Sequence, residues 1–265
     1  MVLLGVPNNV DSLKLLFSTM IGGAVPALVA PGTPSPRLNH LAKSLGARAV
    51  AGARLPGGLT GVNQRYKLPD IQVATFARDT KPNATPGEVI LLTSGTTGFA
   101  SGCVFTLEQL LLNAQRHADS IGQREGDIVL LNLPLHYSFA LVAQALTTLV
   151  MGGRLVVTGP PFHVPSYLEA IDKHGVTISS LTPVLVRSLL QNSTSFPPSL
   201  RVLTVGGDVL GRQHVKELLK RRPGRELYLT YGLTQAGPRV STLAAHREPG
   251  RRFESVGLPI AGTHV

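Results

Sequence analysis

Cysteine is nearly absent from this sequence of 265 residues, in which Cys103 is the single thiol. One cysteine excludes a disulfide framework and a thiolate metal site, and it favours a reducing compartment, so we expect a cytoplasmic protein. No apolar run reaches the roughly 18 residues that a membrane-spanning helix needs, and residues 1–4 are too short for a signal peptide. The sequence therefore predicts a soluble protein without a membrane span.

Charged residues are also few, at 15% of the sequence against 43% hydrophobic residues, which is the composition of a globular protein with a sizeable core. Lysine and arginine outnumber aspartate and glutamate by 25 to 15. The basic excess is concentrated only at 220–225 and 247–252, where no aromatic residues alternate with the charges as a single-strand binder would need. We expect no nucleic-acid partner.

Two common catalytic signatures are missing. No Gly-x-Ser-x-Gly segment marks a serine hydrolase, and most histidines are scattered without the spacing of metal ligands. We assign no role to the following six: His40, His117, His163, His174, His214 and His246.

Segments with helical spacing alternate with short apolar, strand-like segments. The stretch 52–70, rich in glycine, proline and polar residues, reads as a loop or a domain seam, so a division into two α/β subdomains would fall near 52–87. The alternation predicts an α/β fold of layered, mostly parallel sheets with helical crossovers. The expected helices are 11–24 (N-cap Asp11 or Ser12), 34–45, 106–120 (capped by Thr106), 139–151, 165–174, 183–190 and 213–221; the expected strands are 25–29, 48–51, 88–92, 127–133, 154–158, 176–181, 200–205 and 226–230.

A glycine- and hydroxyl-rich loop follows the expected strand 88–92. It reads Thr93-Ser94-Gly95-Thr96-Thr97-Gly98 and continues to Gly102. Glycines allow tight turns and close backbone approach, and successive amide N–H groups with short hydroxyls form an anion cradle suited to phosphate. An ordinary strand-ending loop is the alternative. The density of hydroxyls after a buried strand favours the phosphate site.

Three more loops fall at the carboxyl ends of expected strands, where ligands bind in parallel α/β folds. They are Pro134-Leu135-His136, Gly206-Gly207-Asp208 and Tyr231-Gly232-Leu233-Thr234-Gln235-Ala236. With 93–98, they occur in the order and spacing of the adenylate-forming superfamily of acyl- and aryl-CoA ligases, luciferases and peptide-synthetase adenylation domains. Residues 255–259 resemble the family's next motif. The resemblance covers nearly the whole chain and concerns the large N-terminal, AMP-binding domain.

The resemblance implies that ATP activates a carboxylic acid to an acyl-adenylate and releases pyrophosphate. Thr93 to Gly98 would bind the β- and γ-phosphates, while Gly206, Gly207 and Asp208 would lie along adenine and the acyl group. Tyr231, followed by Gly232, would stack on adenine; taken alone, a tyrosine here is more often a packing residue at a strand end than a nucleotide platform. Thr234 would contact phosphate, and Gln235 occupies the position of a glutamate that holds Mg²⁺.

His136 would form a wall of the acyl pocket, although a histidine in this position would by itself be read as a buried core residue. In α-amino acid adenylation domains an aspartate follows this loop and pairs with the substrate ammonium. The segment 136–144 carries no carboxylate, and a buried ammonium without a counter-charge is costly. The sequence favours an aryl, fatty or other non-amino acid, and Phe139, Val142 and 181–186 suit its pocket.

The chain departs from the family pattern at several positions. Each departure would slow the same chemical step, the formation of the acyl-adenylate. Ser101 stands where the phosphate loop usually has a lysine, and Gln235 where Mg²⁺ expects a carboxylate. The sequence ends before the aspartate that holds ribose and lacks the C-terminal domain with its catalytic lysine. Transition-state charge on phosphate would lose much of its stabilisation. A fragment would explain the missing regions, but it does not explain Ser101 or Gln235.

Two functional hypotheses remain open from the sequence. The first is an acyl- or aryl-acid-activating ligase homologue that is impaired or depends on a partner chain for the missing domain, with ATP or AMP, weakly held Mg²⁺ and CoA or a phosphopantetheine carrier protein as further ligands. The second is a pseudoenzyme or repurposed pocket that binds or transfers an acyl group from acyl-CoA or a carrier without ATP.

Overall fold

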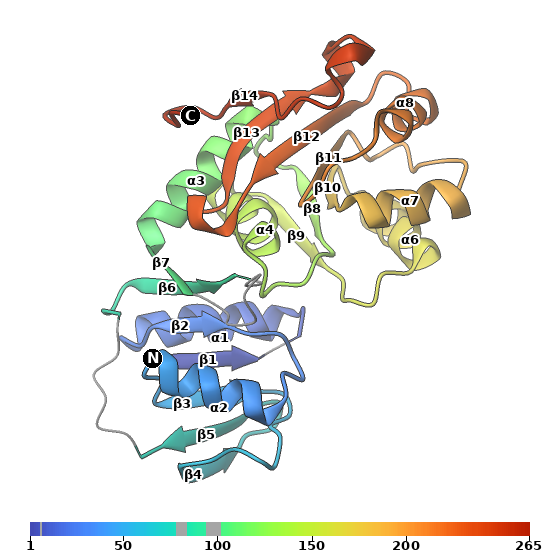
Figure 1. Ribbon diagram of the computed structural model, residues 1–265. Helices are drawn as coiled ribbons and strands as arrows, with labels where there is room; N and C mark the ends of the chain where they lie inside the picture. The colour runs from blue at the N-terminus through green and yellow to red at the C-terminus, as the bar shows by residue number, and fades with distance from the viewer. Residues whose placement is uncertain (6, 78–83, 94–101) are drawn as a thin grey trace. The chain divides into compact units, whose positions relative to one another are not determined.

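The computed structural model describes residues 1–5, 7–77, 84–93 and 102–265. These residues form two compact units. The first comprises Met1–Glu108 and Pro134–Tyr137, and the second comprises Gln109–Leu133 and Ser138–Val265. Within the described ranges each unit contains a seven-stranded sheet (Figure 1).

The sheet of the first unit has the strand order β4-β5-β3-β1-β2-β6-β7. Its central strands β3, β1, β2 and β6 are parallel, whereas β4, β5 and β7 pair antiparallel with their neighbours. The parallel centre follows from the helical crossovers between successive strands. The bounds are β1 (Val2–Gly5), β2 (Pro26–Leu28), β3 (Ala49–Gly52), β4 (Val62–Lys67), β5 (Gln72–Phe76), β6 (Glu88–Leu92) and β7 (Gly102–Thr106).

Two helices connect the first strands of this unit, α1 (Val10–Ile21) and α2 (Ser35–Ser44). The N-cap of α1 is Asn9, whose side chain accepts a hydrogen bond from the Ser12 amide at 2.7 Å, so the expected cap at Asp11 or Ser12 is wrong. The α2 side chains of Leu38 and Leu41 enter the core of the unit together with strand residues. Amphipathic spacing thus anchors α2 on the sheet.

The second sheet has the order β14-β13-β12-β11-β10-β8-β9. Strands β9, β8, β10, β11 and β12 are parallel, and β13 and β14 extend the sheet antiparallel. The bounds are β8 (Ile128–Leu131), β9 (Arg154–Val157), β10 (Ile178–Leu181), β11 (Val202–Gly206), β12 (Glu226–Gly232), β13 (Arg239–Ala244) and β14 (Leu258–Pro259).

Helices cover the second sheet (Figure 1). One core cluster joins side chains of α6, α7 and α8 to residues such as Leu203 and Val205, and a smaller cluster contains Val202, which points to the other face. The bounds are α3 (Leu107–Ser120), α4 (Ser138–Ala140), a π-helical turn (Leu141–Leu146), α5 (Thr147–Val150), α6 (Val164–His174), α7 (Pro183–Asn192) and α8 (Arg212–Arg221), with short 3₁₀ turns at Thr234–Ala236, Ala245–Arg247 and Gly250–Arg252.

The mostly parallel α/β architecture predicted from the sequence is confirmed. The strands that were not predicted include the central strand β1 as well as β4, β5, β7, β13 and β14. Thr106, expected to cap a helix, is the last residue of β7 and directly precedes the first residue of α3, which is the N-cap position. The stretch 52–70, expected to be a loop or seam, contains β4. β4 is mostly exposed, so its sequence carries no hydrophobic alternation that would mark a strand.

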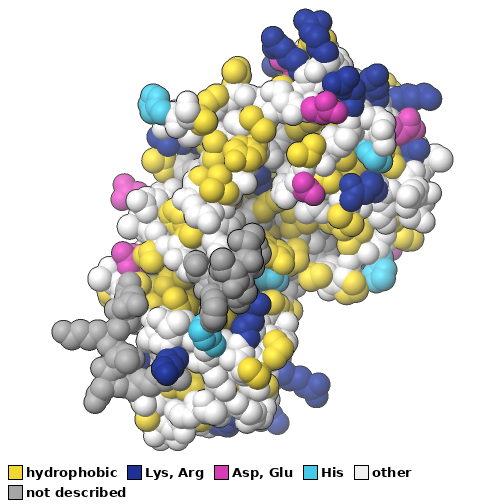
Figure 2. Space-filling view, in the orientation of Figure 1, with side chains coloured by type: hydrophobic (Ala, Val, Ile, Leu, Met, Phe, Trp, Pro, Cys, Tyr) yellow, Lys and Arg dark blue, Asp and Glu magenta, His cyan; other side chains and the backbone are white. Residues whose placement is uncertain are grey.

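Basic side chains gather over α8 and the 3₁₀ turns near 245–252 (Figure 2). Several of them are already engaged. Arg222 is buried and donates to the carbonyl oxygens of Leu200 and Glu226, while Arg221 and Arg252 form ion pairs with glutamates one helical turn away. Among the residues that the structure describes, no helix is long and apolar enough to cross a membrane.

Candidate functional site at the carboxyl edge of the second sheet

Two of the loops predicted to bind ligand are neighbours at the carboxyl edge of the second sheet. β11 ends at Gly206 and β12 at Gly232, and Gly206 pairs with Thr230 in parallel register. Because adjacent parallel strands end at the same edge, the loops that begin at Gly207 and Leu233 leave the sheet together. The register therefore brings together two motifs that are separated by more than twenty positions in the sequence.

A cavity of about 240 Å³ lies between these loops. Four predicted binding residues line it: Gly207, Asp208, Tyr231 and Gly232. The Tyr231 side chain is 46% exposed, so the face of its ring is not consumed by core packing. The other lining residues, mostly apolar, are Val205, Val209, Leu210, Leu229, Thr230, Phe253, Glu254, Ser255 and Val256.

Gly206 and Gly207 are required by the chain itself. A Cβ on Gly206 would lie 2.4 Å from the Thr230 hydroxyl oxygen and 3.2 Å from Nη1 of Arg239. Gly207 has a φ of +90°, a conformation that side-chain-bearing residues rarely adopt. From the sequence, we expected these glycines to lie along a ligand. The structure shows a second reason for Gly206, because residues of β12 and β13 occupy the space beside it.

Thr234 and Gln235 begin a single 3₁₀ turn after β12. The Thr234 hydroxyl lies 3.1 Å from the hydroxyl of buried Ser138, which starts α4. Gln235 is exposed, and its neutral amide is a weaker ligand for a hard cation than a carboxylate. In the described part of the chain, no group of three or more His, Cys, Asp or Glu side chains is arranged to hold a metal ion. At this position Gln235 offers Mg²⁺ a neutral amide oxygen in place of a carboxylate.

Arg239, the first residue of β13, has no counterpart in the sequence predictions. Its side chain is 3% exposed, its guanidinium carbon lies 3.8 Å from the centroid of the Phe139 ring, and its Nη1 donates to Thr230 at 2.8 Å. Nε and Nη2 have no hydrogen-bond partner among the described residues. Burial lowers the pKa of Arg239 to about 9.

The Arg239 backbone is fixed by α3. The Asn113 side chain accepts from the Arg239 amide and donates to the Arg239 carbonyl oxygen, each at 3.0 Å. His117, one turn later on the same helix, is fully buried, and neither ring nitrogen has a partner within the described ranges. Burial, and then the charge of Arg239, lower the pKa of His117 well below its ordinary value. His117 is therefore neutral near pH 7.

Arg239 and His117 are the residues that sequence reasoning missed. The signal available for Arg239 was a lone charge at the start of the apolar, β-branched run after Gly237-Pro238. His117 was set aside because histidines were compared only with metal-ligand spacing. Neither pattern reveals that α3 packs against the start of β13.

The two remaining predicted loops belong to the first unit. Thr93 and His136 line one cavity of about 390 Å³, with Arg37 at the start of α2 and Tyr137. The His136 ring centroid lies 4.3 Å from that of Tyr137, and burial lowers the pKa of His136. Ser94, Gly95, Thr96, Thr97 and Gly98, like Ser101, lie outside the described residues, so their predicted role in phosphate binding stays a prediction.

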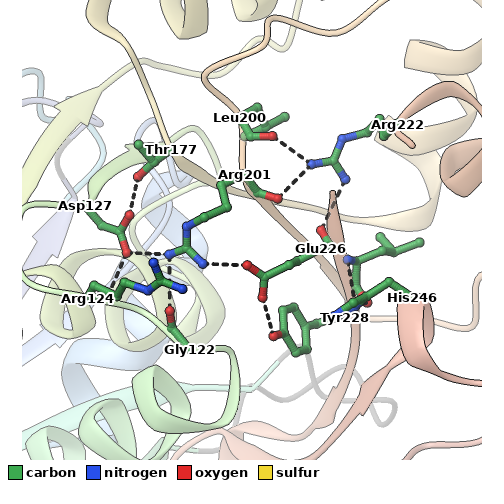
Figure 3. Close-up of polar contacts among 11 residues, drawn as sticks. Gly122, Arg124, Asp127, Thr177, Leu200, Arg201, Arg222, Glu226, Tyr228 and His246 are labelled. Carbon is green, nitrogen blue, oxygen red and sulfur yellow. Dashed lines mark hydrogen bonds and ion pairs between the residues drawn. The ribbon is translucent and has the colours of Figure 1, made fainter. Parts of the chain in front are cut away.

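The opposite, amino edge of the second sheet carries a different kind of polar cluster (Figure 3). Arg201 forms ion pairs with Asp127 at 2.7 Å and with Glu226 at 2.8 Å. The Tyr228 hydroxyl donates to Glu226, and the Thr177 hydroxyl donates to Asp127, each at 2.7 Å. Every member of this cluster has a partner, as in a structural network.

A protein-family comparison gives a match to the AMP-binding enzyme family over residues 1–265. The chain belongs to this family. It is 25% identical over 276 residues to 4-coumarate-CoA ligase 1 of Narcissus pseudonarcissus, covering 94% of this chain and 50% of that protein. It is 28% identical over 289 residues to the 2-succinylbenzoate–CoA ligase of Bacillus pumilus, covering 97% and 58%. The chain thus spans about half the length of these curated relatives.

The comparison with solved structures shows the same fold at low sequence identity. The o-succinylbenzoate CoA synthetase of Bacillus subtilis, in complex with an acyl-adenylate intermediate, superposes with a TM-score of 0.79 at 20% identity. The match covers 98% of this chain and 54% of that one. At this identity the likeness concerns the fold, and the roles of individual residues rest on the site described above.

Proposed function

We propose that this AMP-binding chain binds ATP or AMP together with a non-amino carboxylic acid and takes part in forming an acyl-adenylate. In that reaction a carboxylate oxygen attacks the α-phosphorus of ATP, and the bond to the pyrophosphate leaving group breaks. CoA or the phosphopantetheine thiol of a carrier protein would be the acceptor. The observation that carries the proposal is the cavity of the second unit, because four predicted nucleotide-binding residues line it together.

The cavity suits a purine base. Tyr231 offers a half-exposed aromatic face, and Val209, Leu210 and Val256 add apolar walls. A planar base stacks on such a face while peptide groups of the Gly207–Asp208 segment supply polar contacts at its edge. Thr234, fixed by Ser138, would reach the phosphate that follows the ribose.

The acid is expected to be a non-amino acid. The segment of α4 and the π-helical turn carries no carboxylate, and the buried charge in this region, Arg239, is positive. A substrate ammonium beside Arg239 would be repelled and would lack a counter-charge. Electrostatics therefore favour a non-amino acid over an α-amino acid with its ammonium placed here.

Gln235 and Ser101 distinguish two versions of the proposal. A neutral amide at position 235 holds Mg²⁺ poorly, and a serine at position 101 cannot neutralise phosphate. In the first version the chain adenylates slowly, or only with a partner chain that supplies the missing groups. In the second it binds an acyl group without ATP, as a pseudoenzyme or acyl-transfer module, and exposed, neutral Gln235 is the observation that favours this version.

Nucleotide binding by titration calorimetry tests the site directly. Tyr231→Ala should weaken AMP binding about tenfold, the value of a lost aromatic stack. Tyr66→Ala is the matched control, since Tyr66 is 50% exposed in the first unit and should leave the affinity unchanged. Equal effects of both substitutions would sink the assignment of the cavity to the nucleotide.

Pyrophosphate exchange with a panel of aryl and fatty acids tests the reaction. Exchange by the chain, alone or with candidate partner chains, supports adenylation. Acyl or acyl-CoA binding without exchange and without Mg²⁺-ATP binding would favour the second version. The double variant Ser101→Lys, Gln235→Glu should gain Mg²⁺-dependent ATP binding if these two positions alone weaken the site.

A further inference from the structure

Four buried nitrogen atoms at the carboxyl edge of the second sheet have no hydrogen-bond partner among the described residues. They are Nε and Nη2 of Arg239 and both ring nitrogens of His117. Buried polar groups are nearly always paired, because each unpaired group loses its water without compensation. Two adjacent side chains that share this condition therefore indicate a site prepared for a ligand with acceptor atoms.

The charge of this cluster specifies the kind of ligand. No ion pair formed by the described residues involves Arg239, and the hydroxyl of Thr230, the ring of Phe139 and neutral His117 leave its charge uncompensated. A planar guanidinium with Nε and one Nη available presents the two parallel donors that a carboxylate accepts. The complementary group is an anion with two oxygen atoms in one plane.

The orientation of Arg239 is set in advance. Asn113 holds its backbone at both the amide and the carbonyl, Thr230 accepts from Nη1, and the Phe139 ring lies against the guanidinium face. These contacts engage one nitrogen and one face and leave Nε and Nη2 for another group. A side chain held in this way binds a ligand with little further loss of conformational entropy.

Arg239 also lies next to the candidate site. A Cβ on Gly206 would be 3.2 Å from Nη1, and a Cβ on Gly207 would be 4.0 Å from the Phe139 ring. Thr230, which accepts the Arg239 hydrogen bond, and Gly207 both line the cavity. The guanidinium thus contacts a residue that lines the proposed nucleotide cavity.

We infer that Arg239 is a specificity-determining residue that binds a second acidic group of the substrate, so that the chain selects dicarboxylic acids. One carboxylate remains for activation, and the other pairs with Nε and Nη2 of Arg239 while neutral His117 contributes a further hydrogen bond. This inference rests on the proposed function, because it names the substrate class of the same site.

Pairs of acids that differ by one carboxylate test the inference. Terephthalate is compared with 4-methylbenzoate, and adipate with hexanoate, by titration calorimetry on the chain with and without AMP. The wild type should bind each diacid at least about tenfold more tightly than its partner. Arg239→Met should abolish or reverse the preference, and Arg239→Lys, which keeps the charge without the planar pair of donors, should retain part of it.

Arg154→Met is the control, because Arg154 is exposed at the start of β9 and should leave the preference unchanged. Intact AMP binding with no diacid preference in the wild type overturns the inference and leaves the proposed function standing. Loss of AMP binding in Arg239→Met assigns the arginine to the nucleotide phosphate and also overturns it. Absence of both AMP and acid binding in the wild type overturns the proposed function as well.

Discussion

Arg201 and Arg239 lie at opposite edges of the same sheet, Arg201 just before β11 and Arg239 at the start of β13. Arg201 is 20% exposed in its side chain and has two carboxylate partners and a carbonyl partner. Arg239 is more deeply buried and has one hydroxyl and one aromatic ring. The more buried charge thus has the weaker set of partners, the reverse of what folding stability alone would produce.

The comparison distinguishes two roles of charged side chains at the two edges of the second sheet. At the amino edge, Asp127, Glu226 and Arg201 satisfy one another and link the beginnings of neighbouring strands (Figure 3). At the carboxyl edge, an unpaired cation costs stability that a ligand anion would recover on binding. The paired charges at the amino edge stabilise the chain, whereas by our inference the unpaired donors of Arg239 serve recognition.

The largest expected effect is the loss of the amino-edge network. Arg201→Met should lower the free energy of unfolding by roughly 3 kcal/mol, because it leaves buried Asp127 and partly buried Glu226 without a counter-charge. Urea denaturation measures this change. Arg252→Met is the control, since Arg252 is 60% exposed in its pair with Glu248 and should cost under about 1 kcal/mol. Equal costs would refute a structural role specific to the network.

Arg239→Met should change the free energy of unfolding in the opposite direction. Replacing an unpaired buried cation by an apolar side chain of similar length should raise the free energy of unfolding, by about 1 kcal/mol. Because the pKa of Arg239 is near 9 in the folded chain and higher when unfolded, the gain should shrink as the pH rises above about 9. Urea denaturation at pH 7 and pH 10 measures both quantities. A loss of stability comparable to that of Arg201→Met would contradict the comparison.

A further expected effect, which appears only at acidic pH, concerns His117. Its folded pKa is depressed, so below its unfolded value near 6.5 the unfolded chain binds a proton that the folded chain does not, and stability is lost as the pH falls. The wild type should lose roughly 1.4 kcal/mol per pH unit below 6.5 relative to His117→Leu. Thermal unfolding from pH 7 to pH 5.5 measures this difference. His264→Leu, at an exposed position, should behave like the wild type.

Predictability from the sequence followed burial only in part, since the buried strands β1 and β13 were also missed. Core strands such as β6 and helices such as α2 were placed within one or two residues, because their apolar periodicity reflects the packing they make. β4 was missed because five of its six residues are exposed, and β7 was missed because its residues directly follow the glycine loop and were read with it. Edge strands obtain their conformation from a neighbour rather than from their own pattern.

The sequence by itself determined the family, the mostly parallel α/β architecture and the four loops that carry the motifs, because motif order and hydrophobic period are local properties of the chain. Only the tertiary structure decided that Gly207, Asp208, Tyr231 and Gly232 line one cavity, since this depends on the pairing of β11 with β12. It also decided that Arg239 is buried between Phe139 and Thr230. From the sequence alone, a single arginine is expected to be exposed to solvent. Whether water or α3 covers it depends on contacts between residues more than one hundred positions apart in the sequence.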